Sequence, residues 1–62
     1  MNENTRFYIP GDPVLALQSR AGESYWLPGV VRSVGTSAAR VDLGEARPRR
    51  IPFSRLRLSA GR

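Results

Sequence analysis

Arginine is the side chain with which this sequence is best equipped to do chemistry. All ten basic residues are arginines, set against five carboxylates, and the net charge is +5. The guanidinium group carries a planar fork of donors that pairs with phosphate or carboxylate oxygens. Residues 1–45 hold four arginines and all five acids, whereas residues 46–62 hold six arginines and no acid. The positive charge is therefore concentrated near the end of the chain.

These arginines are expected to form a nucleic-acid-binding surface. In an extended strand Arg50 lies on the opposite face from Arg49. Arg55 and Arg57 lie on either side of Leu56. Several of these arginines can therefore converge on one face of the domain. Arginines neutralise phosphates, and an exposed aromatic ring can stack on a base. The predicted nucleic-acid-binding residues are Arg47, Arg49, Arg50, Arg55, Arg57 and Tyr25. The alternative is a solvated basic face without a partner.

The aromatic residues offer a second possibility. Tyr25, Trp26 and Phe53 could form a cage that binds a methylated Lys or Arg through cation–π attraction. Alternatively, Trp26 and Phe53 belong to the core, because large aromatic side chains supply much of the buried area of a tiny domain. Tyr25, on the opposite strand face from Trp26, is the better candidate for exposure.

The side chains that most enzymes use are missing. The sequence contains no His, no Cys and no Lys, so the usual general bases, activated nucleophiles and transition-metal ligands are absent. Of the five acids, no two fall in the same expected strand. We therefore expect no catalytic residues, no metal and no cofactor.

Pro and Gly divide the chain into short segments, which favour strands over helices. We expect strands over residues 14–18, 25–34, 39–43, 49–53 and 57–58, a loop or hairpin end over Ser19–Ser24 and a 3₁₀ turn over Ser54–Leu56. Pro28-Gly29 is expected to bend the second strand, as a bulge or barrel corner does. A helical alternative, with helices in residues 14–21 and 36–47, also fits the capping pattern.

This layout is that of an all-β, five-stranded SH3-like barrel, and four motifs resemble the Tudor-like pattern in their order. They are Gly11-Asp12-Pro13-Val14-Leu15-Ala16, Tyr25-Trp26-Leu27-Pro28-Gly29-Val30-Val31, Val41-Asp42-Leu43 and Ile51-Pro52-Phe53-Ser54-Arg55-Leu56-Arg57. The resemblance implies a barrel over residues 10–58, with a 3₁₀ turn before the last strand. Residues 1–9 and 59–62 would then be a flexible arm and tail.

A more remote resemblance is to the type II dihydrofolate reductases, which are small SH3-like barrels that assemble around a central pore. The similarity lies in size, in Gly11-Asp12, in Trp26 before Gly29 and in the apolar closing strand. The family's Val-Gln-Ile-Tyr signature corresponds here to Arg49-Arg50-Ile51-Pro52. The residues that would bind folate and nicotinamide are therefore absent, and only the fold is implied.

The sequence thus predicts a small basic binding module with several possible partners. The first is nucleic acid, DNA or RNA, bound with weak sequence preference, and the alternative is an acidic protein surface or a methylated tail. Self-association is also possible, because a chain of 62 residues buries little surface on its own. No stretch reaches the roughly 20 apolar residues of a membrane span, and the polar first residues do not resemble a signal peptide. We expect no membrane partner and a cytoplasmic location.

Overall fold

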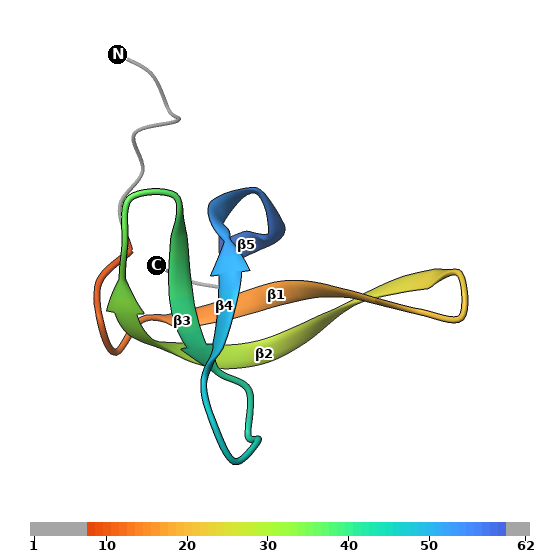
Figure 1. Cartoon of the computed structure of the whole chain (residues 1–62), viewed down its shortest axis with the longest axis horizontal. Helices are drawn as coiled ribbons and strands as arrows, with labels where there is room; N and C mark the ends of the chain where they lie inside the picture. The colour runs from red at the N-terminus through yellow and green to blue at the C-terminus, as the bar shows by residue number, and fades with distance from the viewer. Residues whose placement is uncertain (1–7, 60–62) are drawn as a thin grey trace.

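The computed structural model describes residues 8–59, which form one antiparallel sheet of five strands in the order β4-β3-β2-β1-β5 (Figure 1). The elements are β1 (Pro13–Arg20), β2 (Glu23–Val34), β3 (Ala38–Asp42), β4 (Arg49–Pro52), the 3₁₀ turn η2 (Phe53–Arg55) and β5 (Leu56–Leu58). The all-β expectation is confirmed. The helical alternative is wrong, because both proposed helical segments form strands and turns.

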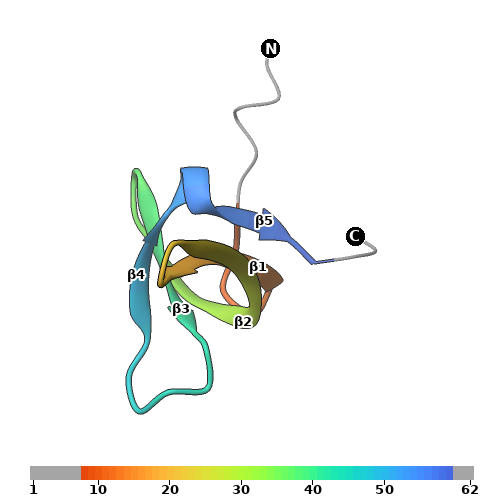
Figure 2. The same cartoon turned by 90° about the vertical axis from the view of Figure 1, so that its right-hand side faces the viewer.

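The sheet curls, because its two edge strands are consecutive in the chain. Only η2 separates β4 from β5, yet β5 pairs with β1 at the opposite edge of the sheet (Figure 2). The five strands and the 3₁₀ turn before the last one agree with the expected layout, with the turn beginning one residue earlier than predicted. Within residues 8–59, β4 does not pair with β5, so no ladder closes the sheet into a barrel.

The core is built from alternate residues of the strands. Its buried members are Val14, Ala16, Val31, Ala39, Val41, Ile51 and Leu56, joined by Tyr8. The largest fully buried side chains are valines, and Leu43, Phe53 and Leu58 pack against the cluster from its margin. Small residues at strand spacing therefore produce a thin core.

The residues just before β1 are fixed to this core. Tyr8 is 7% exposed, and its hydroxyl donates to the carbonyl oxygen of Leu56 at 3.1 Å. Buried Asp12 accepts a hydrogen bond from the Ile9 amide at 3.1 Å, and the amide of Gly11 donates to the Val31 carbonyl at 2.8 Å. The folded unit therefore includes Tyr8 and Ile9, which the sequence assigned to the arm. The remaining residues of the arm, 1–7, and residues 60–62 of the tail lie outside the described part.

The hairpin of β1 and β2 is longer than its sequence suggests. Its register runs from Pro13 opposite Val30 to Arg20 opposite Glu23. Of the two alternatives for residues 19–24, the structure has the hairpin end, with a turn of only two residues. Both turn residues, Ala21 and Gly22, have positive φ angles of 52° and 83°, which match the right-handed twist of a tight hairpin. The end of this hairpin projects from the rest of the molecule (Figure 1).

Gly29 allows a close approach of two strands and does not mark the expected bulge. The β1–β2 register continues without a break through Pro28 and Gly29, and the irregularity lies between Val31 and Ser33. A Cβ at position 29 would lie 2.7 Å from side-chain atoms of both Leu43 and Val41. The Pro-Gly pair therefore permits packing against β3 and leaves the ladder intact.

We predict that Gly29→Ala destabilises the fold by about 1–3 kcal/mol, the usual cost of forcing an extra methyl into a packed interior. Urea unfolding followed by circular dichroism measures this. Gly35→Ala is the matched control, because its Cβ would meet a single atom, the Ala38 carbonyl oxygen at 3.3 Å. Equal losses in the two variants would show that the packing around Gly29 is not the cause.

Candidate functional site

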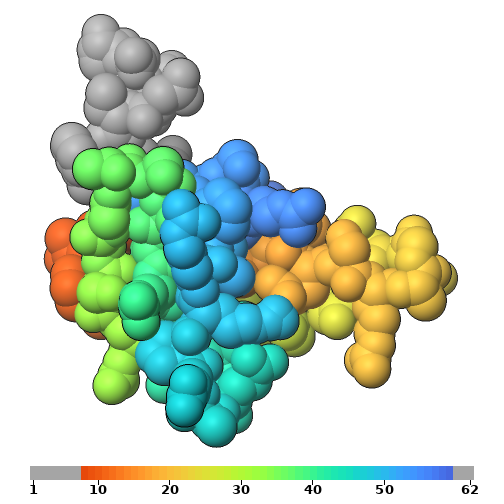
Figure 3. Space-filling view, viewed as in Figure 1, coloured from red at the N-terminus to blue at the C-terminus, as the bar shows by residue number. Residues whose placement is uncertain are grey.

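An open hollow of about 520 Å³ lies between the second half of β1 and strand β4. It exists because β5 pairs only with Val14–Ala16, which leaves the rest of β1 without a neighbour on that side. The hollow is lined by Leu17, Gln18 and Ser19 from β1, by Arg49, Arg50, Ile51 and Pro52 from β4 and by Arg55 from η2. Figure 3 shows β4 and the projecting hairpin next to each other on this face of the molecule.

A second hollow of about 230 Å³ adjoins the first. It lies between the end of β2 and the strands β3 and β4, and Arg40 and Arg50 contribute its charges. Arg50 lines both hollows, so the two share a wall. We call the four arginines that line them, Arg40, Arg49, Arg50 and Arg55, the arginine surface.

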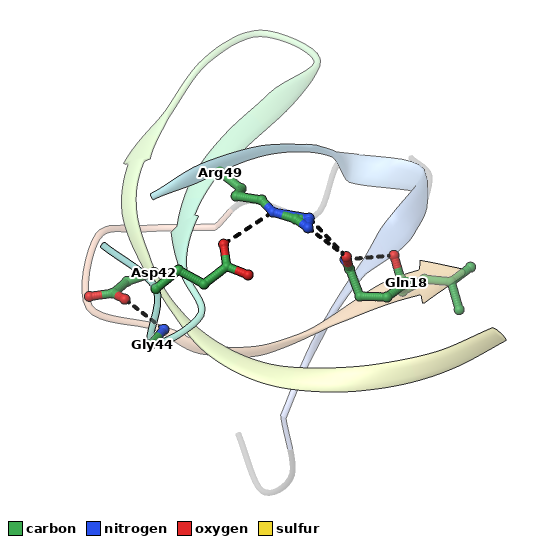
Figure 4. Close-up of polar contacts among 6 residues, drawn as sticks. Gln18, Asp42, Gly44 and Arg49 are labelled. Carbon is green, nitrogen blue, oxygen red and sulfur yellow. Dashed lines mark hydrogen bonds and ion pairs between the residues drawn. The ribbon is translucent and has the colours of Figure 1, made fainter. Parts of the chain in front are cut away.

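Arg49 is the member of this surface that the protein itself engages. Its Nε donates to Glu45 Oε1 at 3.3 Å, and its Nη1 and Nη2 donate to Gln18 Oε1 at 3.1 and 3.2 Å (Figure 4). Arg49 therefore ties β4 to the hairpin across the first hollow. We interpret it as a structural tether that holds the hollow in shape.

Arg40 and Arg50 form a pair of like charges. The β3–β4 register places them directly opposite each other, and both are exposed. Like charges at facing positions destabilise a sheet. Among residues 8–59 the ion pairs are Arg32 with Asp42 at 3.9 Å and Arg49 with Glu45, so no carboxylate compensates this pair. The same holds for Arg55.

The structure separates the five arginines that the sequence grouped together. Arg49, Arg50 and Arg55 meet at the first hollow, as expected. Arg47 lies exposed in the β3–β4 loop and lines neither hollow. Arg57 lies elsewhere, with its guanidinium carbon 4.2 Å from the centre of the Trp26 ring. Arg40, which was not predicted, joins the surface because β3 pairs with β4.

The three aromatic residues do not face one another. Tyr25 and Trp26 are neighbours in β2, so their side chains leave opposite faces of the sheet, and they are 38% and 36% exposed. Phe53 stacks on Tyr8 with ring centres 5.5 Å apart. The arrangement is not that of one cage, and Trp26 is not a core residue. Tyr25 lies opposite Gln18 in the ladder, beside the first hollow.

Comparison of the chain with protein-family models, curated proteins and solved structures gave no match. In the described part of the chain, no three acidic side chains gather as they would around a metal ion. The same residues include no helix that is long and apolar enough to cross a membrane.

We predict that Arg40→Glu stabilises the fold by about 0.2–1 kcal/mol at low salt, because it replaces a repulsive cross-strand pair with an attractive one. Salt should diminish the gain. Thermal unfolding at two ionic strengths measures both effects. The control is Arg20→Glu, which has the same charge change but places the new carboxylate opposite Glu23. Equal stabilisation by both variants would attribute the gain to net charge alone.

Proposed function

We propose that this protein binds nucleic acid through the arginine surface, with weak sequence preference. The observation that carries the proposal is the set of three arginines, Arg40, Arg50 and Arg55, that line adjoining hollows and have no carboxylate partner among the described residues. Phosphate groups would supply the missing negative charge, and guanidinium forks suit their geometry. Phosphate contacts position a nucleic acid without reading its bases.

The surroundings of the first hollow favour a single strand over a duplex. Tyr25 is exposed beside the hollow, and an aromatic ring stacks only on a base that is not already stacked within a helix. Gln18 and Ser19 add polar groups to the same wall. A chain of phosphates along Arg40, Arg50 and Arg55, with one base on Tyr25, uses all of these features.

We propose further that the scaffold which carries this surface is an SH3-like barrel. An SH3-like barrel of the Tudor-like sort is supported by the order of the four sequence motifs, by the strand order and by the 3₁₀ turn before β5. Within that scaffold the binding surface would lie where β4 and the hairpin approach each other.

We predict that Arg50→Ala with Arg55→Ala weakens binding to every oligonucleotide and flattens the salt dependence. Two lost phosphate contacts, at about 0.7 each on a single strand, lower the slope of log K against log salt by about 1.4. Fluorescence anisotropy of labelled single-stranded DNA and RNA at several salt concentrations measures it.

The matched control is Arg20→Ala with Arg32→Ala, which removes the same charge from positions that line neither hollow. An equal slope change in both double variants would mean that total charge, and not this surface, determines binding. Failure of the wild-type protein to bind any oligonucleotide would overturn the proposal. An acidic protein captured by the arginine surface after nuclease treatment would indicate the alternative, a protein-interaction module.

We predict a different pattern for Tyr25→Leu. Loss of one stacked base costs about 1–3 kcal/mol of binding energy on a single strand, while the salt slope stays at the wild-type value because no charge is removed. The same titration with a duplex of equal length is the control, and there the variant should bind like the wild type. An unchanged single-strand affinity would exclude Tyr25 from the interface.

A further inference from the structure

The face of the hairpin that points away from the core carries apolar residues where solvent-facing residues are expected. In an antiparallel sheet with one solvated face, apolar and polar residues alternate. Here residues 13–17 of β1 are apolar at every position. The β1–β2 register pairs the outward ones as Pro13 with Val30, Leu15 with Pro28 and Leu17 with Trp26. We call these six residues the apolar patch.

The apolar patch is accessible to solvent. Val30 is 43% and Trp26 36% exposed, Pro13 and Pro28 are exposed, and the two leucines are half-buried. The molecule thus leaves its single tryptophan at the surface, while the largest fully buried side chains of its core are valines. A small domain with so thin a core commonly gains stability by burying further surface against another chain.

Charges at the two sides of the patch indicate which chain would cover it. On the β3 side, Asp42 lies opposite Val30, and on the β5 side Arg57 lies opposite Leu15 and over the Trp26 ring. The patch is therefore bordered by an acid on one side and a base on the other. A two-fold axis lying in the plane of the patch, parallel to the strands, brings the β3 side of one copy against the β5 side of another. The axis keeps positions along the strands, so each Asp42 would lie two residues, about 7 Å, from Arg57 of the other copy. The long arginine side chain spans this distance when it turns from the Trp26 ring toward Asp42.

We propose that the apolar patch is the interface of a symmetric homodimer, with a second copy of this chain as its occupant. The order of acid, apolar residues and base across the patch is complementary to itself, which favours a second copy of this chain. An acidic partner would be attracted more strongly to the uncompensated arginines around the two hollows than to this patch. The inference does not depend on nucleic-acid binding, because no residue of the apolar patch belongs to the arginine surface. Only Leu17 of the patch also lines the first hollow.

The first test is the mass of the whole chain in solution, measured by sedimentation equilibrium over a range of concentrations. Two strands offer a small contact area, so we predict a weak dimer with twice the 6.9 kDa mass of one chain at high concentration. Val30→Glu should remain at the mass of one chain. Val34→Glu is the matched control, because Val34 lies in the same strand at similar exposure, 40%, but outside the patch.

A wild-type protein that stays monomeric at millimolar concentration would overturn the proposal, as would equal behaviour of the two glutamate variants. Trp26 is the only tryptophan and provides a probe without mutation. Its emission should move to longer wavelength on dilution, together with the fall in mass. Dissociation without a change in this emission would show that the interface lies elsewhere.

The second test depends on the paired charges and does not require Val30→Glu to fold. Asp42→Arg and Arg57→Asp should each be monomeric alone, because each variant places like charges at both contacts. An equimolar mixture should dimerise, because the introduced arginine faces the introduced aspartate at one contact and the native Asp42 faces the native Arg57 at the other. Local damage from losing the Asp42 to Gly44 amide hydrogen bond would not be repaired by mixing. A mixture that stays monomeric would overturn the proposed arrangement.

Discussion

The arrangement of this molecule depends on the mismatch in length between β1 and its neighbour β5. β1 has eight residues, yet β5 has three and pairs only with Val14–Ala16. The remainder of β1 is left with one hydrogen-bonded neighbour, β2, and continues with it as a projecting hairpin. The hollow beside β4 lies along the part of β1 with which β5 does not pair. One short strand thus produces both the opening and the arm that borders it.

Most of the few acidic residues of this chain make hydrogen bonds or ion pairs that support the fold. The arginines that lie away from these acids are therefore left without a compensating charge. Asp12 is buried in the turn before β1, where it accepts the Ile9 amide, and Asp42 accepts the Gly44 amide while pairing with Arg32. Glu45 pairs with Arg49, which in turn bonds Gln18. Carboxylates therefore maintain turns and the tether across the hollow. The cross-strand Arg40 and Arg50 keep their mutual repulsion, which a bound polyanion would relieve.

Local sequence patterns were sufficient to predict where the strands lie, but not which strands pair with each other. Alternation in Ala39, Val41 and Leu43 placed β3, and the Pro-Gly divisions favoured strands over helices. The convergence of Arg49, Arg50 and Arg55 followed from their closeness in sequence. Arg40 could not be found this way, because its place beside Arg50 is set by the β3–β4 register, a long-range property. The separation of Arg57 from the other arginines could not be found for the same reason, since its contact with Trp26 requires β5 to pair with β1.

Neighbouring residues of a strand point to opposite faces of the sheet, so consecutive residues of this hairpin belong to different candidate surfaces. Gln18 and Tyr25 form a cross-strand pair beside the first hollow, and the next pair, Leu17 with Trp26, points to the other face of the same hairpin. The polar and stacking groups of the hairpin therefore lie on the face that Arg49 contacts, while its apolar groups lie on the face of Asp42 and Arg57. A one-residue shift in the β1–β2 register would exchange the two sets and destroy both surfaces. The tight turn at Ala21-Gly22 fixes that register, so a two-residue turn at the far end of the arm determines what each face presents.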